Sequence, residues 1–154
     1  MKFAYVQVRN LEEAQDIVQE AFARVWSSSQ TPPAEQEFKR WLYRAISNLA
    51  IDHHRRKQRE ARLSTSGTPA TSQVDEFERW LNDEMIISAL KRLSIRDRQL
   101  LYLRYFEDQP LSECARLLGL NAVSVRVLVR RALGRLRRAM VSLGPPEEVT
   151  RNVP

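Results

Sequence analysis

The spacing of apolar residues in two segments near the N-terminus most constrains the fold. In residues 10–26 and 35–59, apolar side chains recur in short steps that place them along one face of a helix. In the first segment these residues are Leu11, Ala14, Ile17, Val18, Ala21, Phe22, Val25 and Trp26. Nowhere does the sequence alternate with period two for long enough to predict a strand. The sequence therefore predicts an all-α fold.

The ends of these helices and the positions of later ones can also be predicted. Asn10 with Glu13 three residues later resembles a capping box, and Ser94 resembles a helix cap. Serines and two prolines in residues 27–33 break the first pattern. Further helices are predicted in the ranges 77–93, 94–106, 111–118 and 122 to about 140.

Residues 63–74 (LSTSGTPATSQV) have the composition of a flexible linker, uncharged and rich in Ser, Thr and Pro. We therefore expect two small helical domains that are tethered but free to reorient. Their predicted bounds are 1–62 for the first domain, 63–76 for the linker, 77–142 for the second domain and 143–154 for a tail.

The charge of the chain is basic and segregated. The net charge of +6 favours a polyanionic partner. Residues 114–146 contain no acidic side chain, and a second basic run occupies 55–62, with acidic residues between the two runs. The arginines of the first run are Arg116, Arg126, Arg130, Arg131, Arg135, Arg137 and Arg138. This distribution predicts two separate contacts with anions.

Residues 111–138 have the pattern of a helix-turn-helix. Ala115, Gly119 and Val125 stand where the motif needs a small residue, a turn residue and an apolar anchor. The faces left for the DNA groove carry Ser124, Arg126, Val127, Arg130 and Arg131. The alternative is an amphipathic hairpin with a solvated arginine face, but such faces usually mix both signs of charge. The motif predicts DNA binding.

Taken together, these segments resemble a small bacterial sigma factor of the extracytoplasmic-function type. Residues 16–22 (DIVQEAF) look like region 2.2, which binds the clamp helices of core RNA polymerase. Residues 41–52 (WLYRAISNLAID) look like regions 2.3 and 2.4, which open and read the −10 promoter element. Residues 93–138 look like region 4, whose helix-turn-helix reads the −35 element. Residues 48–54 (NLAIDHH) resemble the iron-uptake branch of the family.

The resemblance implies that the chain binds core RNA polymerase and directs it to specific promoters. The N-terminal domain would read and melt the −10 element, and the C-terminal helix-turn-helix would read the −35 element. An anti-sigma factor is a further implied partner. The implied site residues are Asp16, Gln19 and Glu20 for polymerase, Asn48, Asp52, Arg55 and Arg56 for −10 DNA, and Ser124, Arg126, Val127, Arg130 and Arg131 for −35 DNA.

Two alternatives for these residues stay open. The polar face of residues 16–20 could be an ordinary solvated surface, and Asn48 could be a structural amide rather than a base contact. The chain also departs from the family pattern. Only residues 2–9 correspond to a first helix that is usually longer, so either the start is truncated or the region 2 bundle has a smaller core. Val123 and Ser124 replace the usual glycine and threonine.

Several other classes of site are not expected. Asp52, His53 and His54 resemble a metal-phosphoesterase signature, but no further cluster supports a metal centre. Cys114 is expected to be buried, and as the single cysteine it indicates a reducing cytoplasm. The tryptophans lie on apolar stripes and are expected in the core; they are Trp26, Trp41 and Trp80.

The sequence also indicates which functional classes to exclude. No nucleophile–base pair or phosphate-binding glycine loop is present, so we expect no enzyme, cofactor or small-molecule substrate. No apolar run is long enough for membrane insertion. The alternative function is a free-standing dimeric helix-turn-helix repressor or activator, but two unlike halves and a polar docking helix favour the initiation subunit.

Overall fold

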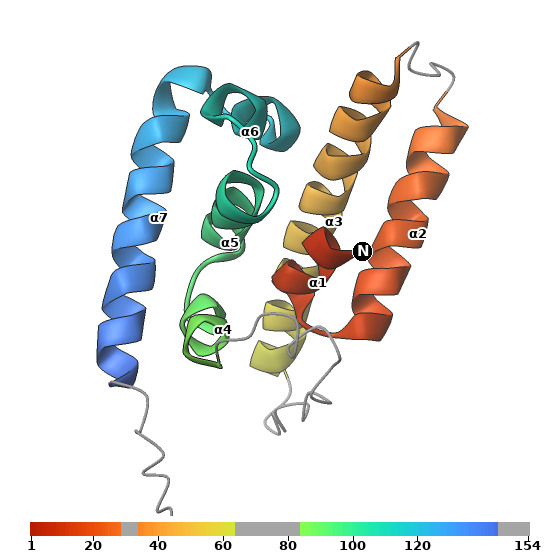
Figure 1. Ribbon diagram of the computed structural model, residues 1–154. Helices are drawn as coiled ribbons and strands as arrows, with labels where there is room; N and C mark the ends of the chain where they lie inside the picture. Colours follow the sequence, from red (N-terminus) through yellow and green to blue (C-terminus); the bar gives the residue numbers. More distant parts are fainter. Residues whose placement is uncertain (29–33, 64–83, 145–154) are drawn as a thin grey trace, which may run out of the picture.

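The computed structural model describes residues 1–28, 34–63 and 84–144, and every regular element in these ranges is a helix (Figure 1). The elements are α1 Lys2–Val8, α2 Leu11–Ser27, α3 Glu35–Leu63, α4 Glu84–Lys91, α5 Ile95–Leu101, the π-helix η2 Tyr102–Phe106, α6 Leu111–Leu118 and α7 Ala122–Leu143. The all-α prediction is confirmed. None of the helices in the described ranges is both long and apolar enough to cross a membrane.

The predicted caps are confirmed in both halves. Asn10 precedes α2, and its side chain accepts a hydrogen bond of 3.1 Å from the backbone N–H of Glu13. Ser94 caps α5 in the same way, accepting from the N–H of Asp97 at 3.2 Å. Each cap satisfies a backbone donor that the helix itself leaves unpaired, and so defines where the helix begins.

Some helix ends differ from the predicted ones. Helix α3 continues to Leu63, beyond the predicted end at residue 59, because the basic segment contains neither Gly nor Pro to stop it. The predicted helix 94–106 is divided into α5 and η2. The wider turn of η2 stacks the rings of Tyr102 and Phe106 with 5.6 Å between their centroids. Of the predicted helix 77–93, the structure describes only the part from Glu84 onward.

The prediction that the tryptophans lie in the core is wrong for Trp26, whose side chain is 87% exposed. Helix α2 packs on α3, and Ala21 and Val25 are among the buried residues of α2. Trp26 follows Val25 by one residue, about 100° further round the helix, and so does not share the buried position of Val25. Trp41 is half-buried, and Trp80 lies outside the described residues.

The two halves pack against each other, which differs from the expectation of free reorientation. One hydrophobic cluster contains buried side chains from both halves, including Phe3 in α1, Ile46 in α3, Leu103 in η2 and Leu117 in α6. Contacts across the two halves join α1 to α5, and α3 to both α5 and α6. Most of the predicted linker and of the tail lies outside the described residues.

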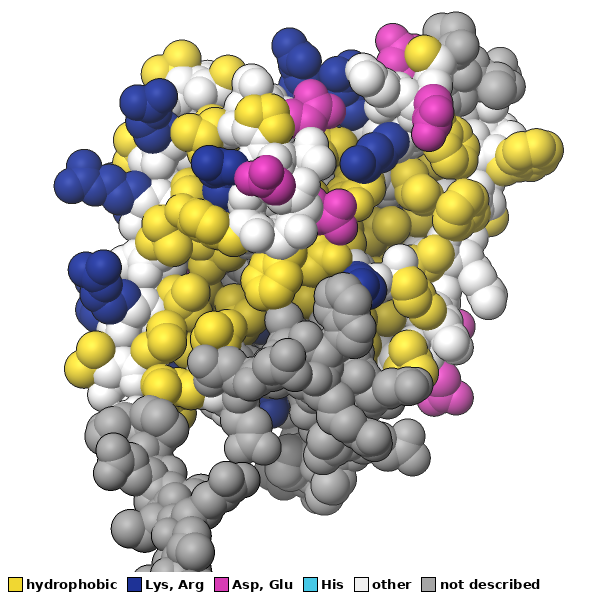
Figure 2. Space-filling view, in the orientation of Figure 1, with side chains coloured by type: hydrophobic (Ala, Val, Ile, Leu, Met, Phe, Trp, Pro, Cys, Tyr) yellow, Lys and Arg dark blue, Asp and Glu magenta, His cyan; other side chains and the backbone are white. Residues whose placement is uncertain are grey.

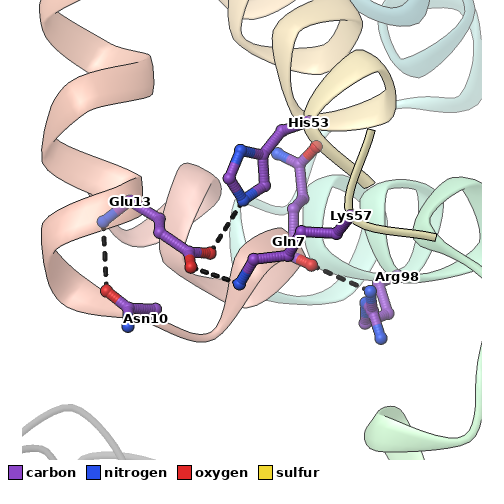
Figure 3. Close-up of polar contacts among 6 residues, drawn as sticks. All are labelled: Gln7, Asn10, Glu13, His53, Lys57 and Arg98. Carbon is purple, nitrogen blue, oxygen red and sulfur yellow. Dashed lines mark hydrogen bonds and ion pairs between the residues drawn. The ribbon is translucent and has the colours of Figure 1, made fainter. Parts of the chain in front are cut away.

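A buried polar network crosses the same boundary (Figure 3). Arg98 of α5 donates to the backbone carbonyl of Gln7 in α1 at 2.8 Å, and also to that of Leu93 at 3.2 Å. Gln99 donates to the side chain of Gln7 and to the carbonyl of Ser47 in α3. Burial lowers the pKa of Arg98 to about 10, so its guanidinium is still charged at neutral pH. Polar pairing thus complements apolar packing at the boundary.

Candidate nucleic-acid interface

Helices α6 and α7 form the predicted helix-turn-helix. Gly119 ends α6 with φ of 63°, a left-handed conformation that favours glycine, and the N–H of Leu120 closes the turn on the carbonyl of Ala115 at 2.8 Å. Ala115 and Val125 are each only 2% exposed, so the small residue and the apolar anchor lie where the motif requires them. The side chain of Asn121 caps α7 by accepting from the N–H of Val123. The sequence predicted this turn correctly.

The outer face of α7 carries a basic surface of a single sign. All five predicted −35 residues are exposed there; they are Ser124, Arg126, Val127, Arg130 and Arg131. In the described part of the chain, no acidic side chain lies within ion-pair distance of these three arginines. Dark-blue side chains accordingly follow the edge of the molecule formed by α7 (Figure 2). Such a surface attracts a polyanion.

Arg135 in α7 has a different role from the exposed arginines. It forms an ion pair with Asp97 in α5, with distances of 2.9 and 3.1 Å from its Nη1 to the two carboxylate oxygens. The carboxylate of Asp97 is largely buried. Arg135 therefore anchors α7 on α5. The basic face that is available to a partner consists of the exposed arginines without an acidic partner among the described residues, such as Arg126, Arg130 and Arg131.

The predicted polymerase residues lie together on α2. Asp16, Gln19 and Glu20 are all exposed, and their spacing places them on adjoining positions of the helix surface. Glu20 also pairs with Arg24 one turn later, with 2.5 Å between Oε1 and Nη2. Both side chains of that pair are more than half exposed, so the pair adds little stability and its groups can exchange partners. This face of α2 is therefore available for docking.

The predicted −10 residues occupy the exposed face of α3. Asn48, Asp52 and Arg55 follow one another at helical spacing, and all are exposed. Asp52 and Arg55 approach to 3.9 Å. Asp52 and Arg56 line a cavity of about 280 Å³ between α2 and α3, and Glu20 of the predicted polymerase group lines the same cavity. The structure therefore brings part of these two groups together.

Asn48 is separate from that cavity and faces the helix-turn-helix. It lines a larger cavity of about 680 Å³ together with Arg44 of the same helix and with Ser112, Arg116 and Ala122 of the opposite half. The amide of Asn48 and the turn of the helix-turn-helix thus border one space. Of the predicted −10 residues, Asp52 and Arg56 thus line one cavity, Asn48 lines the other, and Arg55 lines neither of the two.

Two arginines that the sequence reasoning missed hold this arrangement. Arg40 donates to both carboxylate oxygens of Glu113 in α6, at 3.0 and 3.4 Å, and Arg44 donates to the carbonyl of Arg116 at 3.0 Å. The hydrogen bond from Arg40 is the main reason why the pKa of Glu113 is lowered. Arg40 and Arg44 share a helix face with Asn48 because they are four residues apart. This four-residue spacing was the signal in the sequence from which Arg40 and Arg44 could have been identified.

The histidines and the cysteine have structural contacts. His53 and Lys57 of α3 both bind the carboxylate of Glu13 in α2, which joins these helices (Figure 3). Burial raises the pKa of Glu13, but the two hydrogen bonds outweigh it and the pKa is lowered. Cys114 is buried as expected, and burial raises the pKa of its thiol. Across the described ranges, no group of His, Cys, Asp and Glu could hold a metal ion.

Two family descriptions match this chain in separate segments. Sigma-70 region 2 matches residues 1–60, which contain α1, α2 and nearly all of α3. Sigma-70, region 4 matches residues 83–136, which contain α4 to α6 and most of α7. The two matches have the order that the sequence resemblance implied, and the second includes the helix-turn-helix.

Known relatives match along most of their length. The RNA polymerase sigma factor SigV of Bacillus subtilis is 32% identical over 88% of this chain and 81% of the relative. The RNA polymerase sigma-E factor of Streptomyces coelicolor is 28% identical, over 84% and 73%. The ECF RNA polymerase sigma factor SigW of Bacillus subtilis is 26% identical, over 92% and 83%.

A solved structure has a similar fold, namely the sigma factor RpoE in complex with the anti-sigma factor NepR from Bartonella quintana. Its TM-score is 0.65 with 20% identity, and the match covers 93% of this chain and 89% of RpoE. The relatives are sigma factors, which are not themselves enzymes. The chain belongs to the extracytoplasmic-function family of RNA polymerase sigma factors, the subunits that direct core RNA polymerase to promoters.

Proposed function

We propose that this sigma factor uses three groups of exposed side chains, one for polymerase and two for promoter DNA. The observation that carries the proposal is their arrangement. Polar residues lie on α2, and α3 carries the amide of Asn48 followed by basic residues. The third group is the arginine face of α7, whose charges have no acidic partner among the described residues. A subunit that joins polymerase to two promoter elements needs three such surfaces, whereas a dimeric repressor needs one DNA surface and one self-complementary apolar surface.

The polymerase contact is assigned to Asp16, Gln19 and Glu20. Support comes from their exposure on one region of α2 and from the weakness of the exposed pair between Glu20 and Arg24. Replacing all three with alanine should abolish binding of core polymerase without loss of helical content. Replacing Gln15 and Glu12, which are exposed on the same helix, is the matched control. Unchanged core binding by the triple variant in a pull-down assay would overturn the assignment.

The −10 contact is assigned to Asn48, Asp52, Arg55 and Arg56. An asparagine side chain can donate to and accept from a base edge, and a base extruded from the stack needs such a pocket. Asn48 borders a cavity with room for a base, but the helix-turn-helix forms the other wall of that cavity. A base bound at Asn48 in this cavity would therefore lie beside the turn of the helix-turn-helix.

The −35 contact is assigned to Ser124, Arg126, Val127, Arg130 and Arg131 of α7. Support comes from their exposure and from the absence, in the described part of the chain, of acidic side chains paired with these arginines. Residues near the start of α7 would meet base edges, and later arginines would meet phosphates.

The proposal also includes the domain division, the place of action and an anti-sigma partner. The division into domains 1–62 and 77–142, with linker 63–76 and tail 143–154, defines the two promoter-reading units. The protein acts in the cytoplasm without catalysis of its own. An anti-sigma factor would bind it, as NepR binds the similarly folded RpoE. Co-purification of a partner that blocks transcription and is displaced by core polymerase would support this interaction.

Assignment to the iron-uptake branch rests on residues 48–54 (NLAIDHH) alone. The relatives described above do not carry that designation in their names. Transcription from promoters of iron-uptake genes by the reconstituted holoenzyme would support it. Selection of unrelated promoters from a genomic library would contradict it and leave the sigma-factor function unaffected.

A further inference from the structure

Two apolar side chains, Val123 and Val127, are exposed on the outer face of α7. Val123 is 85% exposed and Val127 is 49% exposed. They are one helical turn apart, and so they share a face. Val125 and Val129, which are 2% and 6% exposed, form the buried face of the same helix. Valine is a weak helix former, so neither core packing nor helix propensity accounts for the two exposed positions.

The surroundings of these valines restrict what can cover them. Ser124, Arg126 and Arg130 flank them and are exposed, and in the described ranges no acidic side chain pairs with the two arginines. The charge favours a polyanion, and the exposed methyl groups favour an apolar group on that polyanion. In DNA, the edges of the bases offer one such group, which is the C5-methyl of thymine in the major groove.

We infer that Val123 and Val127 contact the C5-methyl groups of thymines, and that they select thymine at two nearby positions of the −35 element. The inference rests on the proposed function, in which α7 enters the major groove. Both valines lie in the first two turns of α7, where a recognition helix meets base edges. The neighbouring arginines can then bind the phosphates on either side.

The spacing of the two valines predicts the spacing of the thymines. Side chains four residues apart on a helix have Cβ atoms about 5–6 Å apart. Successive nucleotides of one strand rise about 3.4 Å. The two selected thymines should therefore lie one or two base pairs apart, on the same strand or on opposite strands.

The test removes only the C5-methyl group of thymine, by replacing thymine with deoxyuridine. Holoenzyme reconstituted from the full chain and core polymerase would first recover binding sites from promoter duplexes randomised in the −35 element. Each thymine of the recovered element would then be replaced singly by deoxyuridine. At two positions, one or two base pairs apart, we expect affinity to fall about fourfold, which corresponds to the ~0.8 kcal/mol of one buried apolar carbon group.

Variants connect each methyl group to its valine. Val123→Ala and Val127→Ala should each bind thymine and deoxyuridine equally at one of the two positions and keep the preference at the other. Both side chains are exposed, so the variants should fold normally. Val141→Ala is the matched control, because Val141 is 77% exposed on the same helix face. It lies about 27 Å from Val123 along the helix, which is further than the major groove is wide, about 12 Å.

The outcomes separate this inference from the proposed function. Equal binding of thymine and deoxyuridine at every position of a recovered element would overturn the inference alone. It would also be overturned if both alanine variants kept the full preference for thymine over deoxyuridine. If the holoenzyme recovers no element at all, the proposed function fails and the inference fails with it. Paired losses that each match one valine would establish it.

Discussion

The basic residues of the two halves are used differently. In the N-terminal half, several cations are held by acidic partners: Lys57 by Glu13, Arg24 by Glu20, and Arg40 by Glu113 of the other half. On α7, the exposed arginines Arg126, Arg130 and Arg131 have no such partner among the described residues. Lys57 and Arg40 therefore contribute to structure, whereas the charges of Arg126, Arg130 and Arg131 remain available for DNA.

This difference indicates how the two halves should bind a promoter. An unpaired arginine face supplies affinity that depends on salt and is largely blind to sequence. The assigned residues of α3 combine Arg55 and Arg56 with the carboxylate of Asp52 and the amide of Asn48, so this surface carries less positive charge than the arginines of α7 and depends more on polar groups. We therefore expect α7 to dominate affinity and α3 to dominate opening of the duplex.

The largest expected effect follows removal of the free arginines of α7. Replacing Arg126, Arg130 and Arg131 with alanine should lower holoenzyme affinity for a selected promoter by about 100- to 1,000-fold near 0.1 M salt, if each contacts a phosphate. The slope of log affinity against log salt should become shallower by about 0.9 for each lost contact. Filter binding over a salt series measures both values.

A contact with a base would give a different pattern from a contact with a phosphate. If one arginine binds a guanine through two hydrogen bonds, its loss should cost about 1–3 kcal/mol at one base pair and relax specificity there.

Arg55→Ala, at a residue already close to Asp52, should change the salt slope less than any single α7 variant. An equal change in slope would contradict the contrast between the halves.

The boundary between the halves should be sensitive to loss of Arg98. In Arg98→Met the carbonyls of Gln7 and Leu93 would lose a buried, charged donor. We expect the free energy of unfolding to fall by about 2–4 kcal/mol, measured by urea denaturation. Arg137→Met, at an exposed position of α7, is the control and should change stability by less than about 0.5 kcal/mol. Equal stability of both variants would mean that the halves do not depend on this network.

The ion pair between Arg40 and Glu113 should give a smaller effect that depends on pH. The pKa of Glu113 is lowered below its ordinary value of 4.5, so its stabilising contribution is present above that value and is lost as pH falls through the lowered pKa. Glu113→Gln should cost about 0.5–1 kcal/mol at neutral pH, because the pair is partly exposed. The difference in urea denaturation between the two proteins should disappear in acid. A difference that persists there would exclude the ion pair as its cause.

The smallest expected effect is a gain in stability. Gly134 lies within α7, and a Cβ added there would meet no atom within 4 Å apart from its chain neighbours and the backbone of the adjacent helical turns. Gly134→Ala should therefore stabilise the protein by about 0.5–1 kcal/mol through helix propensity. Thermal unfolding measures this gain. A loss of promoter affinity in the same variant would indicate that DNA approaches the backbone at this position.

Local features of the fold could be predicted from the sequence because each depends on neighbouring residues. The caps at Asn10 and Ser94, the turn at Gly119 and the burial of Ala115 and Val125 follow from short patterns. The positions assigned to polymerase and promoter came from the family resemblance, and they remain predictions about contact.

Features that depend on packing between distant segments could not be predicted. The boundary between the halves uses Gln7, Arg98 and Gln99, and such polar residues within helices give no sign that they are buried. The exposure of Trp26 depends on the direction from which α3 approaches α2. Arg40 and Arg44 had helical spacing, but nothing nearby in sequence indicated that α6 would be their partner.

Transcription by reconstituted holoenzyme on promoters altered in one element at a time distinguishes the roles of the two halves. On a selected promoter, the wild-type chain should add specific initiation to core polymerase, and a base change in either element should reduce it. In Asn48→Ala the −10 change should lose its effect while the −35 change keeps it, and the α7 variants should show the reverse. No initiation above core polymerase alone, together with symmetric footprints of the free chain on duplex DNA, would contradict the account and favour a dimeric repressor.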